Sequence, residues 1–196
     1  AAESWGQYCR RFVEKYTVDF TEKELLETID RTRTWYWSSP ERHRQGRADL
    51  IGTRRKIVGL SLESLAIFDE EIAFDLADSY SAVRDAKIHL FPHTIETLER
   101  LHSLDVRLGL VTNGTASEQR SKINRFGLGR FFEVCLIEGE TGYGKPDLRV
   151  YRRALWELDL EPGEVWMVGD NLVWDVGAPQ KLGIYSIWND YKHMGL

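Results

Sequence analysis

The sequence predicts an α/β fold in which a helical first half, residues 1–88, precedes a second half, residues 89–196, built of strands and helices. Apolar residues of the first half recur at the spacing of amphipathic helices. Those of the second half fall into short runs separated by helical stretches. Because strands joined by helices are normally parallel, we expect the second half to form a parallel sheet layered with helices. The helical first half should form a separate domain.

Helix signals dominate the first half. Thr21 with Glu24 forms a capping box, and Ser39 before Pro40 is a helix start. Residues 4–16 also have the pattern of a helix. One apolar stripe predicts a single long helix, and it consists of Leu62, Leu65, Ala66, Ile72, Ala73 and Leu76. We expect these helices to pack as a small bundle.

The second half alternates between helices and strands. The expected strands are residues 106–111, 132–137, 165–168 and 184–188, and the expected helices are residues 94–103, 115–126 and 146–158. Right-handed crossovers place the carboxyl ends of all strands at one edge of the sheet, where open α/β folds bind ligands. The residues to examine are therefore 112–114, 138–139 and 169–171.

The first strand end has the features of an anion site. Thr112 offers a hydroxyl, Asn113 an amide, and Gly114 lets the backbone turn before a helix whose amino end carries free N–H donors. The alternative is an ordinary strand-to-helix turn capped by Thr115.

Lys145 lies in a glycine-rich loop before a helix, where its ammonium could neutralise a phosphate. The alternative is a solvated loop lysine. The spacing Gly139-x-x-x-x-Gly144-Lys145 also matches a nucleotide-binding P-loop, but Pro146 stands where that loop needs Ser or Thr. A P-loop-like nucleotide hydrolase is therefore a minor alternative.

Two carboxylates follow the third strand. Asp170 lies at its tip and Asp175 in the next turn, and two hard oxygen ligands near a phosphate suit Mg²⁺. Asn171 beside them is a candidate phosphate-binding residue. The alternative is a helix amino end that carries acids because the macrodipole favours them.

In order and spacing, the segments that carry these residues resemble the motifs of the haloacid dehalogenase-like superfamily; they are residues 111–114, 144–147, 168–170 and 175–178. The resemblance implies a three-layer Rossmann-like core domain over residues 89–196 and an α-helical cap over residues 1–88. It implies that Thr112 holds phosphoryl oxygens, Lys145 stabilises the phosphate charge, Asp170 coordinates Mg²⁺ and Asp175 supports the metal shell. Catalytic candidates are thus Thr112, Asn113 and Lys145, and threonine at position 112 resembles phosphatases more than dehalogenases.

Members of that family begin with a strand ending in Asp-x-Asp-x-Thr, whose first aspartate attacks phosphorus. The 196 residues contain no such string, and the nearest, Asp75 and Asp78, are three apart within a predicted helix. Three explanations stay open: a fragment of a longer product, a shortened protein with another use, or hydrolysis by metal-bound water. We expect a Mg²⁺-dependent phosphatase of small phosphorylated metabolites with weakened or altered activity. The alternative is an inactive homologue that serves as a binding or assembly module.

Composition bounds the partners. A net charge of −5 argues against a nucleic-acid binder, and no apolar segment is long enough to span a membrane. Cys9 and Cys135 lie far apart and in no metal-ligand spacing, which favours free thiols and a cytoplasmic location. Without its first strand the sheet would keep two open edges, and either a rearranged amino-terminal segment, residues 1–11, or a second copy of the chain could cover them. The homodimer is favoured, because residues 4–16 fit a helix better than a strand.

Overall fold

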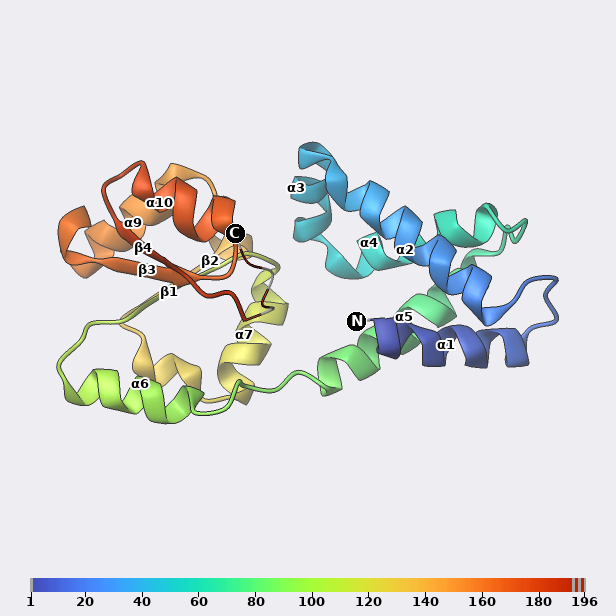
Figure 1. The fold of residues 1–196 in the computed structure, drawn as a ribbon, viewed down its shortest axis with the longest axis horizontal. Coiled ribbons are helices and arrows are strands. Elements are labelled where there is room, and N and C mark those ends of the chain that lie inside the picture. Colours follow the sequence, from blue (N-terminus) through green and yellow to red (C-terminus); the bar gives the residue numbers. More distant parts are fainter. Residues whose placement is uncertain (1, 192, 194, 196) are drawn as a thin grey trace. The chain divides into compact units, whose positions relative to one another are not determined.

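The computed structural model describes residues 2–191, 193 and 195. The chain divides into two compact units, Ala1–His89 and Leu90–Leu196, which we call the helical unit and the α/β unit (Figure 1). No helix in the described part of the chain combines the length and the apolar character that crossing a membrane requires.

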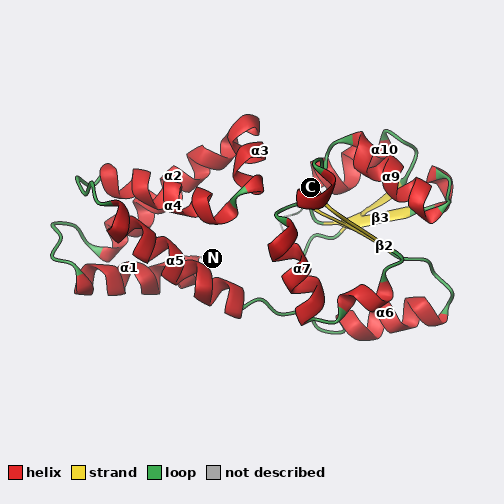
Figure 2. Ribbon diagram, turned by 180° about the vertical axis from the view of Figure 1, so that it is seen from behind, coloured by secondary structure: helices red, strands yellow, loops and turns green. Residues whose placement is uncertain are grey.

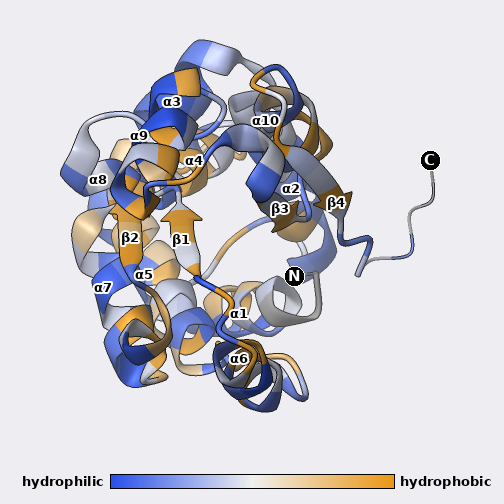
Figure 3. Cartoon of the chain, turned by 90° about the vertical axis from the view of Figure 1, so that its left-hand side faces the viewer, coloured by the Kyte–Doolittle hydropathy of each residue, from blue (hydrophilic) through white to orange (hydrophobic). Residues whose placement is uncertain are grey.

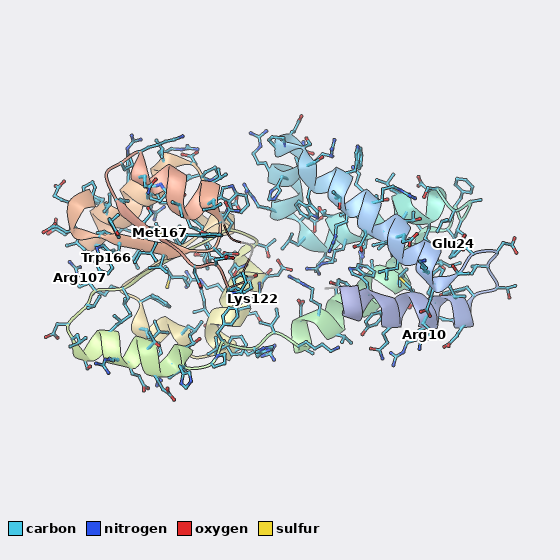
Figure 4. All side chains as sticks on the ribbon, in the orientation of Figure 1. Arg10, Glu24, Arg107, Lys122, Trp166 and Met167 are labelled. Atoms are coloured by element: carbon cyan, nitrogen blue, oxygen red, sulfur yellow. The ribbon has the colours of Figure 1, made fainter. Side chains whose placement is uncertain are left out.

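In the part of the helical unit that the structure describes, the regular elements are all helices: α1 (Ala2–Lys15), α2 (Glu22–Ser38), α3 (Pro40–Ala48), α4 (Leu50–Glu63) and α5 (Glu70–Ala86). Their starts follow the local sequence. Thr21 and Glu24 exchange both hydrogen bonds of a capping box at α2, and Ser39 caps α3 ahead of Pro40. Figure 4 labels Glu24 at this start.

The core of the helical unit joins α1, α2, α4 and α5. Within it the ring of Trp5 stacks on that of Tyr80, with ring centroids 3.7 Å apart. Its buried apolar side chains include Tyr8, Cys9, Phe12, Leu25, Ile29, Val58, Leu62, Ala73, Leu76 and Ala77. Burying this apolar surface supplies most of the stability of such a bundle, since the propensity of single helices is weak.

The single long helix predicted across residues 62–76 is wrong. Helix α4 ends at Glu63, Ala66 takes the left-handed conformation with φ 63°, and α5 begins after Asp69. The Asp69 carboxylate accepts hydrogen bonds from the N–H groups of Glu71 and Ile72, which makes it an N-cap. The apolar stripe continues across the break because both helices face the same core.

The α/β unit alternates strands and helices. Its α-helices are α6 (Thr94–Ser103), α7 (Ala116–Arg125), α8 (Glu138–Thr141), α9 (Leu148–Leu158) and α10 (Ala178–Gln180). Its strands are β1 (Gly109–Thr112), β2 (Val134–Ile137), β3 (Trp166–Gly169) and β4 (Tyr185–Trp188). Short turns of other helix types complete it: η1 (Leu128–Phe131), η2 (Pro162–Glu164) and the π-helical η3 (Leu172–Gly177).

The strands form two parallel pairs rather than one continuous sheet. β1 pairs with β2, with Thr112 opposite Ile137, and β3 pairs with β4, with Gly169 opposite Trp188. Figure 3 shows the two pairs, each with its strands side by side. Among the described residues, no strand pairs with the second edge of β1 or of β3. The predicted α/β class with parallel strands is confirmed, and Trp166 and Val168 of β3 are exposed at 69% and 58%.

Helices α9 and α10 lie on one side of the strands, and α6 and α7 lie on the other side, where the face of β3 stays uncovered (Figures 1 and 2). One apolar cluster joins both strand pairs to the α9 side. Its members include Val111, Val134, Leu136, Val150, Tyr151, Leu155, Leu158, Met167, Ala178 and Ile184. Figure 4 labels Met167 beside its exposed neighbour Trp166. The alternation along β3 therefore sends one side chain to the core and the next to the uncovered face.

Candidate active site at the strand ends

A buried ion pair links the loop before α9 to the turn after β3. Nζ of Lys145 lies 2.6 Å from Oδ1 of Asp175, and the two side chains are only 14% and 4% exposed. Oδ2 of Asp175 accepts a hydrogen bond of 3.0 Å from the N–H of Asn171. Both oxygens of Asp175 therefore have partners, and the carboxylate fixes the position of the lysine ammonium.

Gly169 makes room for this pair. A Cβ atom at Gly169 would lie 2.3 Å from Cγ of Asp175, closer than any real contact. Glycine at the end of β3 thus lets the Asp175 side chain pack directly against the strand backbone.

Asn113, directly after β1, holds the backbone of Lys145. Its Nδ2 donates to the carbonyl oxygen of Lys145 at 2.6 Å, and its Oδ1 accepts from the N–H of Lys145 at 2.8 Å. The carboxyl ends of β1 and β3 are therefore connected through one residue, Lys145.

Thr112 and Gly114 lie on either side of Asn113. The Thr112 hydroxyl donates to Oε1 of Gln119 at 3.3 Å. Gly114 has φ 121°, a conformation that favours glycine, and its N–H donates to Oε2 of Glu138 at 3.1 Å. The Gly114 N–H, at the predicted anion site, thus donates to the Glu138 carboxylate in this arrangement.

Asp170 and Asn171 differ in their environment although they are neighbours. The Asp170 side chain is exposed and its carboxylate has no hydrogen-bond partner among the described residues. Oδ1 of Asn171 accepts hydrogen bonds from the N–H groups of Val173 and Trp174, at 3.0 and 2.9 Å, and so caps η3. Of these two side chains, Asp170 is the one available to a ligand.

Tyr151 of α9 supports the turn that carries Asp175. Its hydroxyl donates to the carbonyl oxygen of Trp174, and the ring belongs to the apolar cluster. Burial raises the pKa of Tyr151, and the negative charge of Asp175 raises it further. The hydroxyl therefore stays protonated and remains a donor.

Few side-chain oxygen atoms in this region are available as ligands for Mg²⁺. Within the described residues there is no group of three or more His, Cys, Asp or Glu side chains that could hold a metal ion. Mg²⁺ usually keeps several waters and needs only one or two carboxylates, so Asp170 alone fits as a ligand. Asp175 lies nearby in the chain but is already bonded to Lys145 and Asn171.

Sequence reasoning missed two residues that order this edge, Gln119 and Tyr151. Glu138, directly after β2, was named by the strand-end rule but was given no role. Gln119 and Tyr151 lie inside helices and no local pattern distinguishes them from other helical residues.

This chain is similar to known proteins in sequence and in fold. A family model described as haloacid dehalogenase-like hydrolase matches residues 7–189. A phosphoserine phosphatase of Thermus thermophilus is 37% identical over 120 residues, which cover 61% of this chain and 48% of that protein. A glyceraldehyde 3-phosphate phosphatase of Methanopyrus kandleri is 28% identical, over 87% of this chain and 67% of its own length. The chain thus spans about half of the first relative and two thirds of the second.

Among solved structures, a HAD phosphatase from Thermococcus onnurineus superposes with a TM-score of 0.54 at 26% identity. The match covers 92% of this chain and 86% of that one.

Proposed function

Because this chain belongs to the haloacid dehalogenase-like hydrolases, we propose that it supplies the helical cap and the core of a Mg²⁺-dependent phosphatase for small phosphorylated metabolites. The observation that carries the proposal is the Lys145 ammonium, held by Asp175 at the strand ends close in sequence to the exposed carboxylate of Asp170. Relatives named as phosphatases support the reaction class.

Four residues of the candidate site have a role in this proposal. The Lys145 ammonium binds phosphate oxygens and offsets their charge, and the Thr112 hydroxyl turns from Gln119 to donate to the same group. Asp170 holds Mg²⁺, which, when bound, would screen the phosphate charge and polarise its oxygens. Asp175 keeps the ammonium in place.

Activity of the 196 residues should be feeble. They contain no two aspartates separated by a single residue, so they offer no matching pair of attacking carboxylate and general acid. We expect the chain to bind the phosphate group measurably although it hydrolyses phosphate esters slowly. The same observation favours the alternative, a binding or assembly module that retains the anion site.

Turnover of an activated aryl phosphate with Mg²⁺ present tests the proposal. We expect Lys145→Ala to lower kcat/KM by about tenfold or more, because it removes a charge that acts on the phosphate. Lys181→Ala, which removes an exposed lysine of the same unit, should change kcat/KM by less than about twofold. Robust metal-independent turnover that survives Lys145→Ala would contradict the proposal. Phosphate binding without turnover would favour the binding module.

A homodimer remains a prediction. The unpaired edges of β1 and β3, with Trp166 and Val168 exposed beside them, favour a second copy that covers this surface. Size-exclusion chromatography with light scattering tests it. A monomer of 22.8 kDa at all concentrations would rule the dimer out.

A further inference from the structure

We infer that Asn113 is a positioning residue for Lys145 and does not bind the phosphate through its side-chain amide. The inference rests on the proposed function, since it assigns how that anion site is built. It starts from the two hydrogen bonds between the Asn113 amide and the backbone of Lys145, a residue 32 positions later.

The orientation of the Asn113 amide is fixed by its partners. The N–H of Lys145 can only donate and its carbonyl oxygen can only accept, so Oδ1 must face the first and Nδ2 the second. An Asn side chain can accept from the N–H and donate to the carbonyl oxygen at once, as the backbone of a neighbouring strand does in a sheet. Aspartate could meet one of them and leucine neither.

Gly144 shows how closely the two segments approach. A Cβ atom at Gly144 would lie 2.5 Å from Oδ1 of Asn113 and 2.8 Å from Cβ of Glu138. Only glycine leaves the loop close enough for the Asn113 amide to reach the next peptide group. Both sides of the contact are thus shaped for it.

The side chain of Lys145 continues from this fixed backbone to Asp175. Its Nζ lies 2.6 Å from Oδ1 of Asp175, and Asp175 in turn accepts from the N–H of Asn171. One end of the lysine is therefore held by the loop after β1 and the other by the turn after β3. Loss of Asn113 should free the backbone end and let the ammonium leave its place.

The first test measures Lys145 directly, without any activity. In Asn113→Leu we expect the Lys145 amide to exchange its hydrogen at least about tenfold faster, because its acceptor is gone. The rate at which an amine-reactive reagent acylates Lys145, measured by mass spectrometry, should rise by a similar factor. The exposed Lys23 serves as an internal control. Asn113→Asp keeps one acceptor and should lie between the parent and Asn113→Leu.

Control variants separate positioning from general damage. Asn124→Leu replaces an exposed asparagine of α7 and should leave Lys145 unchanged. Gly144→Ala pushes on the same contact from the other side and should expose Lys145 although Asn113 is intact. Lys145 exchange and acylation that stay within about twofold of the parent in folded Asn113→Leu and Gly144→Ala would overturn the inference.

A double-mutant cycle with inorganic phosphate then separates positioning from direct binding. Asn113→Leu should weaken phosphate binding about tenfold in the parent, and less than about twofold when Lys145 is already alanine. Additive effects would mean that Asn113 binds phosphate independently and would overturn the inference. If the parent itself binds no phosphate, the proposed function fails, and the exchange and acylation of Lys145 still decide the positioning role.

Discussion

Lys145 and Asp175 form an ion pair of 2.6 Å between two loops that follow different strands, with little of either side chain exposed to water. Such a pair is costly to break from one side, because the remaining charge stays buried without a partner. This relationship gives the strand ends a rigid link across the unpaired edges of β1 and β3.

Asp175→Asn should lower the free energy of unfolding of the α/β unit by about 3 kcal/mol, since Lys145 then lacks a countercharge. Urea unfolding followed by circular dichroism measures it. Glu157→Gln, which breaks the exposed pair with Arg153, is the control and should change stability little. Equal effects of the two variants on the free energy of unfolding would show that the buried pair stabilises the protein no more than the exposed pair does.

Gly169→Ala should destabilise the chain by about 2 kcal/mol, because the new Cβ atom occupies the space of the Asp175 carboxylate. Gly163→Ala is a matched control: a Cβ there meets nothing within 4 Å. Thermal unfolding of both variants gives the comparison. If Gly169→Ala melts with the parent, Asp175 can move aside without loss.

Asp170→Asn should weaken Mg²⁺ binding at least about tenfold, because it removes the exposed carboxylate at the strand tip. Isothermal titration with MgCl₂ measures the affinity, which we expect to be low in the parent. Asp105→Asn removes a carboxylate that precedes β1 and serves as the control. Equal Mg²⁺ affinity in the parent and in Asp170→Asn would sink the assignment.

The stability of the helical unit should depend on pH through Asp78. Arg55 donates hydrogen bonds of 2.9 and 2.5 Å to this carboxylate and holds its pKa below the ordinary value. Since the folded pKa is the lower one, the pair stabilises the protein above the unfolded pKa of about 3.9 and is lost as pH falls through the folded value.

Asp78→Asn should therefore lower the Tm at pH 7, and the difference from the parent should close as the pH falls below about 4. Thermal scans by circular dichroism at several pH values measure it. Asp19→Asn, at an exposed carboxylate with no ion-pair partner among the described residues, is the control. A difference that persists at pH 2.5 would mean that Asp78 acts by packing and not by charge.

Local signals in the sequence predicted the elements well where a cap or a turn marks them. Thr21, Thr115 and Asp147 each begin a helix as expected, because their side chains accept from backbone N–H groups nearby in sequence. The break between α4 and α5 was missed, since the apolar period runs on through Ala66. The acids at residues 69–71 are the signal that could have marked the new helix start.

The sequence predicted residues of the candidate site but not the hydrogen bonds and the ion pair that join them. The sequence named Asn113 at a strand end, Lys145 in a glycine-rich loop and Asp175 in the turn after a strand, without relating them. Their contacts join residues about 30 positions apart, and such contacts depend on loop geometry that no periodic pattern encodes. For the same reason the sequence did not assign Asn171 to a cap.

The two strand pairs share one apolar cluster but, among the described residues, no ladder hydrogen bonds. Cooperativity within the α/β unit must therefore pass through side chains of α9 and α10 and through the Lys145 link. Hydrogen exchange under native conditions should then resolve two opening units, β1–β2 and β3–β4, each with its own free energy. Leu155→Ala in α9 would leave a cavity in the apolar cluster and weaken the coupling between the two strand pairs. The α/β unit should then melt in stages and no longer behave as one folding domain.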